Sequence, residues 1–533
     1  MRTRADEIKF FAGQPSDLRP DKGSERSMGT VFKLFHFDIA TENNFGDTLL
    51  FPAVKHMFEA YGAGEAFDIY DSRPLRENVG PALVKYINRT ADAVVVGGGG
   101  LFLSDTNPNR ESGWQWRISL DMLEQLEVPL IVFAVGYNRF YGQPDFEPPF
   151  SEHVARTIEK SVFFGLRNHG SIEKVAEYVP DELKSRITYQ PCPTTLSKSV
   201  LPIDVEQPDA KRIGLQLSTS RRYAGHGVGP DMVIERAGQL LPRLEEAGWD
   251  VVFTPFTNPD QRLSARLGEQ FKSREMVQVY GDDVLTRGLR DLADVPFLLG
   301  CRGHAQMIPF GLGALPFSFD VHPKLGYFLS DIGRPEWRHD PKDPAFAESI
   351  LATIEDGWEN REANRTHIAD KQADFLDITL DNLDVIYSEL GGDPSTLESR
   401  FAPYDAQAWN MARSRFLLEV QRENSIHRQQ TSAENARKTE AELKTALRNC
   451  RTAADDRQIL EATVLREQVS AGTMQREKTR IEEKTKQLEQ ENRALREQLQ
   501  QQGSSTASTR LRRVRRNVGR TVDNVMKRGQ SDS

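Results

Sequence analysis

The pattern of apolar and polar positions changes twice along the chain. Residues 1–29 are polar and rich in charge, Gly, Pro and Ser, which predicts a flexible arm. From about residue 30 onward, short apolar runs alternate with helix-sized amphipathic stretches. After about residue 406 the chain is rich in Glu, Gln, Arg, Lys, Ala and Leu and contains few aromatic residues. The pattern therefore predicts an arm, an α/β region and a helical C-terminal part.

The apolar runs of the central region predict two parallel β-sheets. They are short, lack strict polar alternation and are separated by helical stretches, which is typical of buried parallel strands in α/β folds. The expected strands are residues 31–37, 66–70, 93–96, 130–135, 162–166, 212–217, 250–253, 277–280, 297–299 and 315–319. Because this spacing breaks at 193–207, we expect two Rossmann-like domains, 30–195 and 205–340, that face each other across a cleft. Ligands of such sheets bind beyond the carboxyl ends of the strands.

The segments after the last expected strand are helical by pattern. We expect residues 341–400 to form a return segment that packs across both domains. Within 406–502, apolar residues recur at intervals of seven: Met474, Ile481, Leu488 and Leu495. A seven-residue repeat is typical of a coiled coil, which predicts a homo-oligomer. A solvated single helix is the alternative.

A Gly- and Ser-rich linker separates the expected coiled coil from a basic tail, residues 509–533. Apolar residues recur at steps of three and four along the tail, which predicts one apolar helical stripe flanked by Arg. Basic amphipathic helices of this kind lie on anionic membranes. We therefore expect peripheral membrane contact, with a disordered tail or a partner-binding helix as the alternatives.

Composition and charge exclude several classes of protein. The 533 residues carry a net charge of −9, which argues against nucleic-acid binding through overall charge. The three cysteines, Cys192, Cys301 and Cys450, are too widely spaced for a disulfide scaffold or a zinc ribbon. No apolar run reaches the ~20 residues of a membrane span, and the N-terminus lacks the features of a secretory signal. We expect a cytoplasmic protein that is peripheral at the inner face of the membrane.

The first expected strand leads into Asn44, Gly46 and Asp47, which precede an amphipathic helix expected from about Thr48. A glycine at a strand-to-helix turn lets the backbone approach a ligand, and an exposed helix N-terminus favours anions. We expect Asp47 to cap this helix, and a cap alone is the alternative to a role in binding. We interpret His36, on the strand, as a core histidine.

The glycines at positions 97–100 end the third expected strand. Backbone N–H groups of such a loop can form a cradle for phosphate or carboxylate. The glycine spacing matches neither a dinucleotide fingerprint nor a P-loop. Ser104 and Asp105 follow closely, and we expect them to contact a sugar.

Polar side chains follow a later strand of the first domain. Arg167 ends the strand expected at 162–166, and Ser171 comes shortly after it. Arginine can clamp a carboxylate or a phosphate through two hydrogen bonds. A surface salt bridge is the alternative for Arg167.

The block around the last two expected strands carries the most specific pattern. One strand leads into Arg302 and His304, and the next delivers Asp320, His322 and Lys324 to its carboxyl end. The cationic members of this block suit a polyanionic small ligand. A histidine with a pKa near ~6.5 can donate or accept a proton at neutral pH. Unrelated salt-bridge partners are the alternative, and we expect the neighbouring Cys301 to be packed rather than reactive.

The order of these motifs resembles that of the polysaccharide pyruvyl transferase family over about residues 31–333. Members are similar to GT-B glycosyltransferases in having two Rossmann-like domains around a cleft. The resemblance implies transfer of the pyruvate unit of phosphoenolpyruvate to two hydroxyls of a sugar in a surface polysaccharide or its precursor. The products are a ketal and phosphate. We expect no cofactor, and no residue spacing demands a metal.

The resemblance assigns roles to particular residues. Arg302 and His304 are the expected catalytic residues, with His304 as the general acid. His322, also expected to bind substrate, or Asp320 is the reserve base. The resemblance assigns substrate binding to the other motif residues: Asn44, Gly46, Asp47, Gly97, Gly98, Gly99, Gly100, Arg167, Ser171 and Lys324.

The chain departs from the usual family motifs at Asn168, at Gly303 and in the segment 191–193. The Arg302–His304 pair matches them. Two other functions stay open: a GT-B-type glycosyltransferase that uses a nucleotide sugar, and a non-catalytic glycan-binding scaffold. The expected partners are phosphoenolpyruvate, a saccharide or lipid-linked glycan acceptor, further copies of the chain through the coiled coil, and an anionic membrane. No nucleic acid is expected.

Overall fold

The computed structural model describes residues 31–39, 44–103, 110–201, 206–270, 287–403, 425, 432, 435–444 and 456–501. Contacts divide the chain into two units, Met1–Val420 and Gln421–Ser533. Several expectations fall outside the described residues: the arm 1–29, Ser104 and Asp105, the strand 277–280, the linker 503–508 and the tail 509–533.

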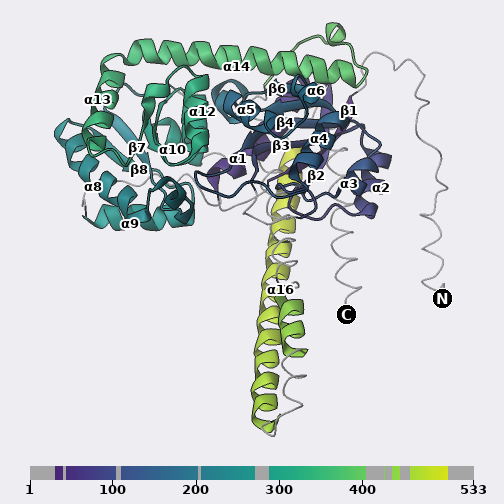
Figure 1. The fold of residues 1–533 in the computed structure, drawn as a ribbon. Coiled ribbons are helices and arrows are strands. Elements are labelled where there is room, and N and C mark those ends of the chain that lie inside the picture. The colour runs from purple at the N-terminus through teal and green to yellow at the C-terminus, as the bar shows by residue number, and fades with distance from the viewer. Residues whose placement is uncertain are drawn as a thin grey trace, which may run out of the picture. The chain divides into compact units, whose positions relative to one another are not determined.

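The first unit contains two parallel β-sheets, and we call the parts built on them the first and second domains (Figure 1). The first sheet has the strand order β2-β1-β3-β4-β5-β6. Its strands are β1 (Phe32–Asp38), β2 (Phe67–Pro74), β3 (Ala93–Phe102), β4 (Leu130–Tyr137), β5 (Ser161–Leu166) and β6 (Ile187–Tyr189). The helices of this domain are α1 (Phe45–Ala60), α2 (Pro81–Thr90), α3 (Leu120–Glu124), α4 (Phe150–Lys160), α5 (His169–Ala176) and α6 (Asp181–Lys184).

The second sheet has the strand order β11-β10-β9-β7-β8. Its strands are β7 (Arg212–Gln216), β8 (Asp250–Phe253), β9 (Phe297–Gly300), β10 (Leu315–Phe319) and β11 (Arg338–His339). The accompanying helices are α7 (Ser197–Val200), α8 (Pro230–Glu246), α9 (Asn258–Gln270), α10 (Leu289–Ala293), α11 (His304–Gly311), α12 (Pro323–Asp331) and α13 (Phe346–Glu359). Short 3₁₀ turns are η2 (Gly62–Gly64), η3 (Pro193–Leu196), η4 (Arg221–His226), η6 (Pro335–Trp337) and η7 (Pro394–Thr396).

The expected pair of α/β domains with parallel sheets is confirmed, because every strand pair of both sheets is parallel in the described part of the chain. The strands formed by long apolar runs lie within a few residues of their expected positions. The pattern missed β6 and β11. These edge strands have three and two residues, too few to show a hydrophobic period.

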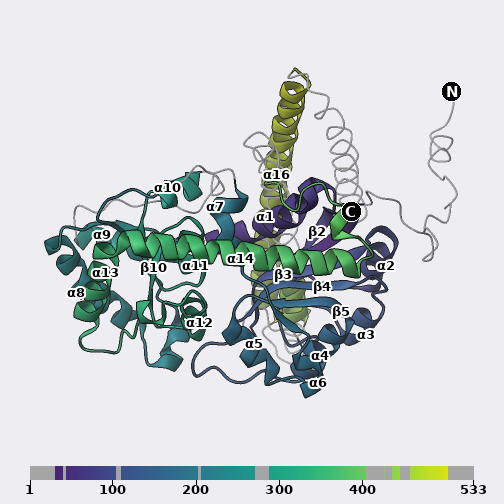
Figure 2. The same ribbon diagram turned by 90° about the horizontal axis from the view of Figure 1, so that it is seen from above.

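Helix α14 (Arg361–Glu389) runs across both domains (Figures 1 and 2). In its first half it meets the second domain, where Gln372 Nε2 donates a hydrogen bond to the carbonyl of Phe310. Toward its end it meets the first domain, where Asn382 Nδ2 donates to the carbonyl of Tyr189 at 2.9 Å. Helix α14 therefore contacts both domains and connects them.

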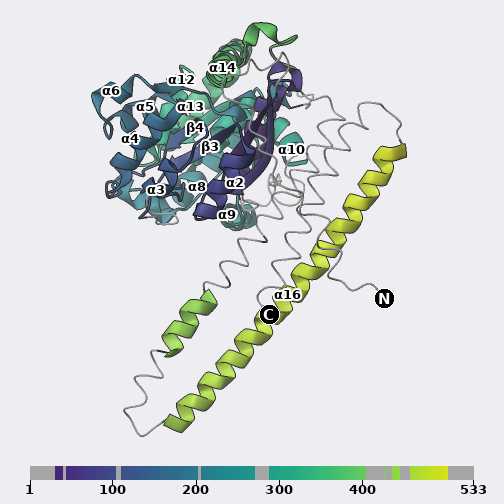
Figure 3. The ribbon, with the colours of Figure 1, turned by 90° about the vertical axis from the view of Figure 1, so that its right-hand side faces the viewer.

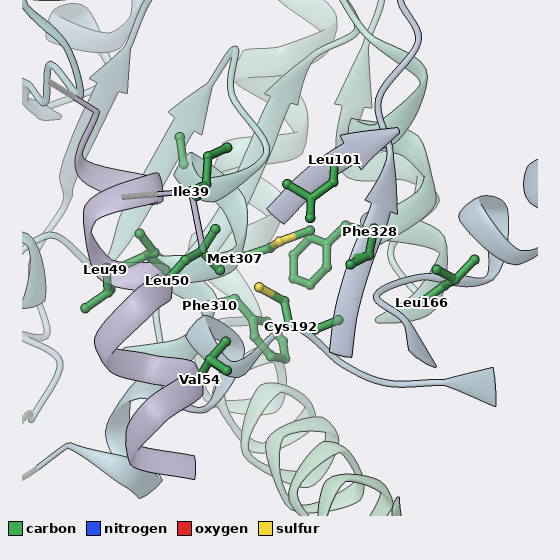
Figure 4. Packing of buried hydrophobic residues seen from close by; sticks show 14 of the residues in the cluster. Ile39, Leu49, Leu50, Val54, Leu101, Leu166, Cys192, Met307, Phe310 and Phe328 are labelled. Atoms are coloured by element: carbon green, nitrogen blue, oxygen red, sulfur yellow. The ribbon is translucent and has the colours of Figure 1, made fainter. Parts of the chain in front are cut away.

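The hydrophobic core continues from one domain into the other (Figure 4). Leu50 of α1 in the first domain is buried in the same cluster as Met307 and Phe310 of α11 in the second domain. The start of α1 also donates a backbone hydrogen bond across the domains, from Phe45 N–H to Phe256 O at 3.0 Å. Burial of apolar surface therefore holds the facing ends of the two sheets together.

The second unit contains α16 (Asp456–Gln501), a continuous helix of 46 residues (Figure 3). Val464, Leu465 and Val469 on this helix expose 47%, 64% and 65% of their surfaces. The coiled coil stays a prediction. No described helix of either unit is long and apolar enough to cross a membrane.

Candidate functional site

The first motif lies at the N-terminus of α1, where the domains meet. Asn44 is the N-cap, because its Oδ1 accepts a hydrogen bond from Gly46 N–H at 3.2 Å. The expectation that Asp47 caps the helix is wrong: α1 begins at Phe45, so Asp47 lies inside the first turn. The Asn44 Nδ2 group donates to Asp47 Oδ2 at 2.7 Å and orients the carboxylate.

Gly46 leaves room for His304, the first residue of α11 in the second domain. A Cβ atom on Gly46 would lie 2.3 Å from His304 Nδ1 and 2.4 Å from His304 Cβ. The imidazole Nδ1 is 3.8 Å from Asp47 Oδ1, and the buried Nε2 has no hydrogen-bond partner among the described residues. Burial, with the nearby charges of Arg167 and Lys324, lowers the pKa of His304 well below its usual value.

Arg167 directly follows β5 and occupies the space above Gly136 of β4. A Cβ atom on Gly136 would lie 2.2 Å from Arg167 Nε. The side chain is only 4% exposed, and its Nε makes no hydrogen bond with the described residues. Burial lowers the pKa of Arg167, against the opposing effects of Cys192 and Asp47. A buried arginine with an unused donor is a strong site for an anion.

Lys324 lies in the first turn of α12, which His322 caps by accepting the Lys324 N–H on Nδ1 at 3.1 Å. The ammonium donates to Asn138 Oδ1 of the first domain at 2.8 Å. A Cβ atom on Gly303 would lie 3.4 Å from Lys324 Cε, an ordinary van der Waals contact, so the lysine stem passes close to Gly303. Burial, and next the charge of Arg167, lower the pKa of Lys324 to about 7.

Arg302 is held by a carboxylate that the sequence analysis did not identify. Its Nε and Nη2 donate to Asp260 Oδ2 and Oδ1 at 2.9 and 2.7 Å. Asp260 is 1% exposed and also accepts from Gln216 Nε2 at 3.0 Å. The Nη2 group also donates to the Thr257 hydroxyl at 3.3 Å, whereas Nη1 makes no hydrogen bond with the described residues.

Two further arginines belong to the site and were not predicted from sequence. The Arg76 Nε donates to Gln115 Oε1 at 2.8 Å, and the Arg76 guanidinium interacts electrostatically with Asp47 and Arg222. The Arg222 guanidinium lies 5.2 Å from the centre of the Phe140 ring. Both arginines lie outside the recognisable motifs, and only the tertiary fold brings them to Asp47 and Lys324.

The charges around Asp47 are strongly unbalanced. Burial raises the pKa of Asp47, and four cationic side chains oppose this effect: Arg76, Lys324, Arg302 and Arg167. With Arg222, five cationic groups stand against the carboxylates of Asp47 and Asp260. Such a cluster in an acidic protein favours a small polyanion.

The glycine row lies within β3 and is packed against neighbouring elements. A Cβ atom on Gly97 would lie 2.0 Å from Phe133 O of β4, and Gly98 and Gly99 face Leu50 of α1. Gly100 instead faces the Asn138 side chain, and a Cβ atom on Gly100 would lie 2.7 Å from Asn138 Nδ2. The glycines thus permit close packing of β3. The anion cradle stays a prediction.

Other expected residues have structural partners. Ser171 is fully buried and its Oγ accepts from Tyr137 N–H at 2.9 Å. Asn168, a departure from the family motif, caps α5 by accepting from Ser171 N–H at 2.8 Å. Asp320 accepts from the Tyr141 hydroxyl at 3.2 Å and pairs with Arg338 at 3.6 Å. These side chains are engaged in holding the fold.

Two residues outside the site behave as expected. His36 is buried, its Nε2 shares a hydrogen bond with the Gly97 carbonyl, and burial lowers its pKa to about 4. Cys301 is 2% exposed, and burial raises its pKa to about 12, so it is packed rather than reactive. No group of three or more His, Cys, Asp or Glu in the described ranges could hold a metal ion.

Comparisons with known proteins identify the family of the chain. No curated protein matches the chain. Among solved structures, a glycosyltransferase from Rickettsia africae has a TM-score of 0.42 and 12% identity, over 68% of this chain and 98% of that one. A putative UDP-N-acetylglucosamine 2-epimerase from Listeria monocytogenes has a TM-score of 0.40 and 12% identity, over 64% and 91%. The family model described as polysaccharide pyruvyl transferase matches residues 44–322, more than half of the chain, so the protein belongs to the polysaccharide pyruvyl transferase family.

Proposed function

We propose that the protein transfers the pyruvate unit of phosphoenolpyruvate to two hydroxyls of a sugar in a surface polysaccharide or its precursor, forming a ketal and releasing phosphate. Family membership makes the protein a polysaccharide-modifying transferase. The observation that carries the finer proposal is the convergence of Arg167 from the first domain with His304 and Lys324 from the second around Asp47.

The charge of the donor suits this cluster. Phosphoenolpyruvate presents a carboxylate and a phosphate, both of which arginine binds through paired hydrogen bonds. The buried Nε of Arg167 and the remaining edge of Arg302 supply such donors, and Lys324 adds a compact charge. Binding the donor would give the buried Arg167 guanidinium an anionic partner, and a buried charge is costly while it is unpaired.

The reaction needs two proton transfers and one bond cleavage. A proton adds to the methylene carbon of the donor, and an acceptor hydroxyl oxygen bonds to the adjacent carbon and loses its proton. The bond from this carbon to the phosphate oxygen then breaks, and phosphate leaves with the electron pair. The second hydroxyl closes the ketal and gives up its proton. One hydroxyl proton balances the proton added to carbon, and the other leaves with phosphate or solvent.

His304 is the group placed to move a proton. It is neutral in the free protein because burial lowers its pKa. The negative charges of a bound donor raise the pKa of a neighbouring imidazole, so His304 becomes a proton donor when the donor is present. Asp47, 3.8 Å from Nδ1, stabilises the imidazolium and is the carboxylate placed to accept a hydroxyl proton. Both ring nitrogens of His322 have protein partners, Lys324 N–H and Asn138 O, so His322 is not the base in this proposal.

Turnover with defined substrates tests the proposal. The protein is incubated with phosphoenolpyruvate and a panel of acceptor glycans, and phosphate release is followed together with the acceptor mass. We expect phosphate release to match the gain of one pyruvate unit, and His304→Ala to abolish both while the control His367→Ala retains them. Consumption of a nucleotide sugar instead of phosphoenolpyruvate would contradict the proposal. Binding of glycans without any turnover would also contradict it.

The C-terminal part has a separate proposed role. The heptad pattern of residues 474–495 and the exposed apolar side chains of α16 support self-association of this helix. The basic tail 509–533 supports attachment to an anionic membrane, near a lipid-linked acceptor. Deleting the tail should release the protein from vesicles that contain phosphatidylserine. Unchanged binding would exclude the tail as the membrane anchor.

A further inference from the structure

Asn138 connects the two domains through both its side chain and its backbone. It directly follows β4, and its N–H donates to Phe102 O of β3 at 2.9 Å. Its Nδ2 donates to Gly100 O at 3.1 Å, while its Oδ1 accepts from Lys324 Nζ at 2.8 Å. Its carbonyl oxygen lies 3.3 Å from His322 Nε2. Two of these partners belong to the first domain and two to the second.

The orientation of the Asn138 amide follows from its partners. An ammonium group only donates hydrogen bonds, so it requires the amide oxygen. A backbone carbonyl only accepts, so Gly100 requires the amide nitrogen. Gly100 also leaves room for this side chain, since a Cβ atom there would lie 2.7 Å from Asn138 Nδ2 and 2.8 Å from Asn138 Cγ. Gly100 therefore fixes the orientation of the Asn138 amide, whose oxygen accepts the hydrogen bond from Lys324.

The residues after Asn138 strengthen the same contact between domains. The Phe140 ring lies 4.2 Å from the His322 ring and 6.2 Å from the Tyr223 ring, measured between centroids. The Tyr141 ring stacks on His226 at 3.9 Å. Asn138 thus meets Lys324 at the point where this loop of the first domain packs on the second domain.

We infer that Asn138 is a positioning residue that holds the ammonium of Lys324 in the donor site when the two domains are together. The inference rests on the proposed function, because it treats Lys324 as a ligand of the anionic donor. A neutral amide holds the lysine without adding an opposing charge, so the positive charge of the protonated lysine remains available to the donor. A carboxylate at this position would hold the lysine as well but would neutralise it.

Substitutions of Asn138 should move the titration of Lys324 in opposite directions. The charged and titratable groups that act on Lys324 are Arg167, Asp47, Arg302, Arg222, His304 and His322. Asn138→Ala removes an acceptor from the ammonium and lowers the pKa of Lys324 below about 7. Asn138→Asp adds a carboxylate and raises that pKa by about one unit or more. A merely structural role would not give shifts of opposite sign.

The test uses the full-length protein and two readouts. The first is the pH dependence of kcat/KM for phosphoenolpyruvate, which reports groups of the free enzyme. We expect kcat/KM to fall as pH rises through about 7 in the wild type, because Lys324 loses its charge. The fall should come at lower pH in Asn138→Ala and at higher pH in Asn138→Asp. At neutral pH, Asn138→Ala should lose ~10- to 100-fold in kcat/KM, the range for a hydrogen bond to a charged group.

The second readout does not depend on turnover. An amine-reactive acetylating reagent modifies only the neutral form of Lys324, and mass spectrometry of the labelled peptide gives the labelling rate against pH. The control Asn88→Ala removes an asparagine of the first domain that binds backbone groups of the loop after α3. Equal titration of Lys324 in the wild type, Asn138→Ala and Asn138→Asp would overturn the inference. If the labelling shifts are found but phosphoenolpyruvate is not consumed, the positioning of Lys324 stands and the proposed donor fails.

Discussion

Replacing Gly46 with alanine should displace the His304 side chain and lower activity, although His304 itself is unchanged. The added methyl group would lie 2.4 Å from the Cβ of His304 and 2.3 Å from its Nδ1. Ordinary contacts of a Cβ atom begin at about 3.4 Å, so the histidine or α1 must move by about 1 Å. Misplacement of a reacting group by about 1 Å can lower the rate ~10²-fold.

The same substitution should change the folded fraction of the protein much less than it changes activity. Gly46 lies in the first turn of α1, and alanine is favoured over glycine inside helices by up to about 1 kcal/mol. Crowding in a packed interior costs typically ~1–3 kcal/mol. These opposing effects leave a net loss of at most about 3 kcal/mol in the free energy of unfolding. Activity should therefore fall much more than the folded fraction.

The assay compares kcat, KM for phosphoenolpyruvate and thermal unfolding in Gly46→Ala and in the control Gly238→Ala. Gly238 lies in α8, and a Cβ atom there would meet nothing within 4 Å, so this variant should keep full activity. Full activity of Gly46→Ala would refute this reasoning, as would an equal loss of activity in Gly238→Ala.

The other predictions concern the remaining contacts of the site and the stability of the fold. Gly136→Ala should displace Arg167, because the added methyl would lie 2.2 Å from its Nε; KM for phosphoenolpyruvate should rise at least ~10-fold, and an unchanged KM would exclude the contact. Asp260→Asn should loosen Arg302 and lower kcat at least ~10-fold while circular dichroism stays unchanged; equal kcat would show that the ion pair does not position the arginine. Truncation after residue 420 should leave a folded protein with a smaller assembly by light scattering, and an assembly of unchanged size would exclude α16 as the oligomerising helix. The free energy of unfolding should fall as pH drops from 6.5 toward 4, because buried histidines stay neutral in the folded protein while the unfolded chain binds protons there; a flat profile of urea-unfolding midpoints would contradict this. The histidines whose pKa burial lowers to about 4 include His36, His56 and His153.

The sequence pattern identified the parts of the fold that depend on local apolar runs. Strands β3, β4 and β10 are buried on both faces and therefore appear as continuous apolar segments. The start of α1 was placed too late because Phe45 and Gly46 resemble loop residues until Asn44 is seen to cap the helix. Such a cap depends on a side-chain orientation that spacing alone does not define.

The candidate site was predictable only where its residues belong to motifs. Arg167, His304 and Lys324 lie at strand ends or helix starts, so topology brings them together. Arg76 and Asn138 lie in loops, and their proximity depends on how the domains pack. The sequence predicts an anion cradle only at residues 97–100, and that cradle stays a prediction. The structure adds a different role for glycine: Gly46, Gly100 and Gly136 leave room for side chains from other elements.

Donor binding in the absence of an acceptor tests most directly whether residues of both domains form one site for phosphoenolpyruvate. Titration calorimetry would compare the wild type with Arg167→Ala in the first domain and Lys324→Ala in the second, and with Arg243→Ala, a surface ion-pair variant, as the control. We expect one phosphoenolpyruvate per chain, binding at least ~10-fold weaker in either site variant and unchanged in the control. Binding that is absent from the wild type, or unaffected by one of the two site substitutions, would contradict a shared site.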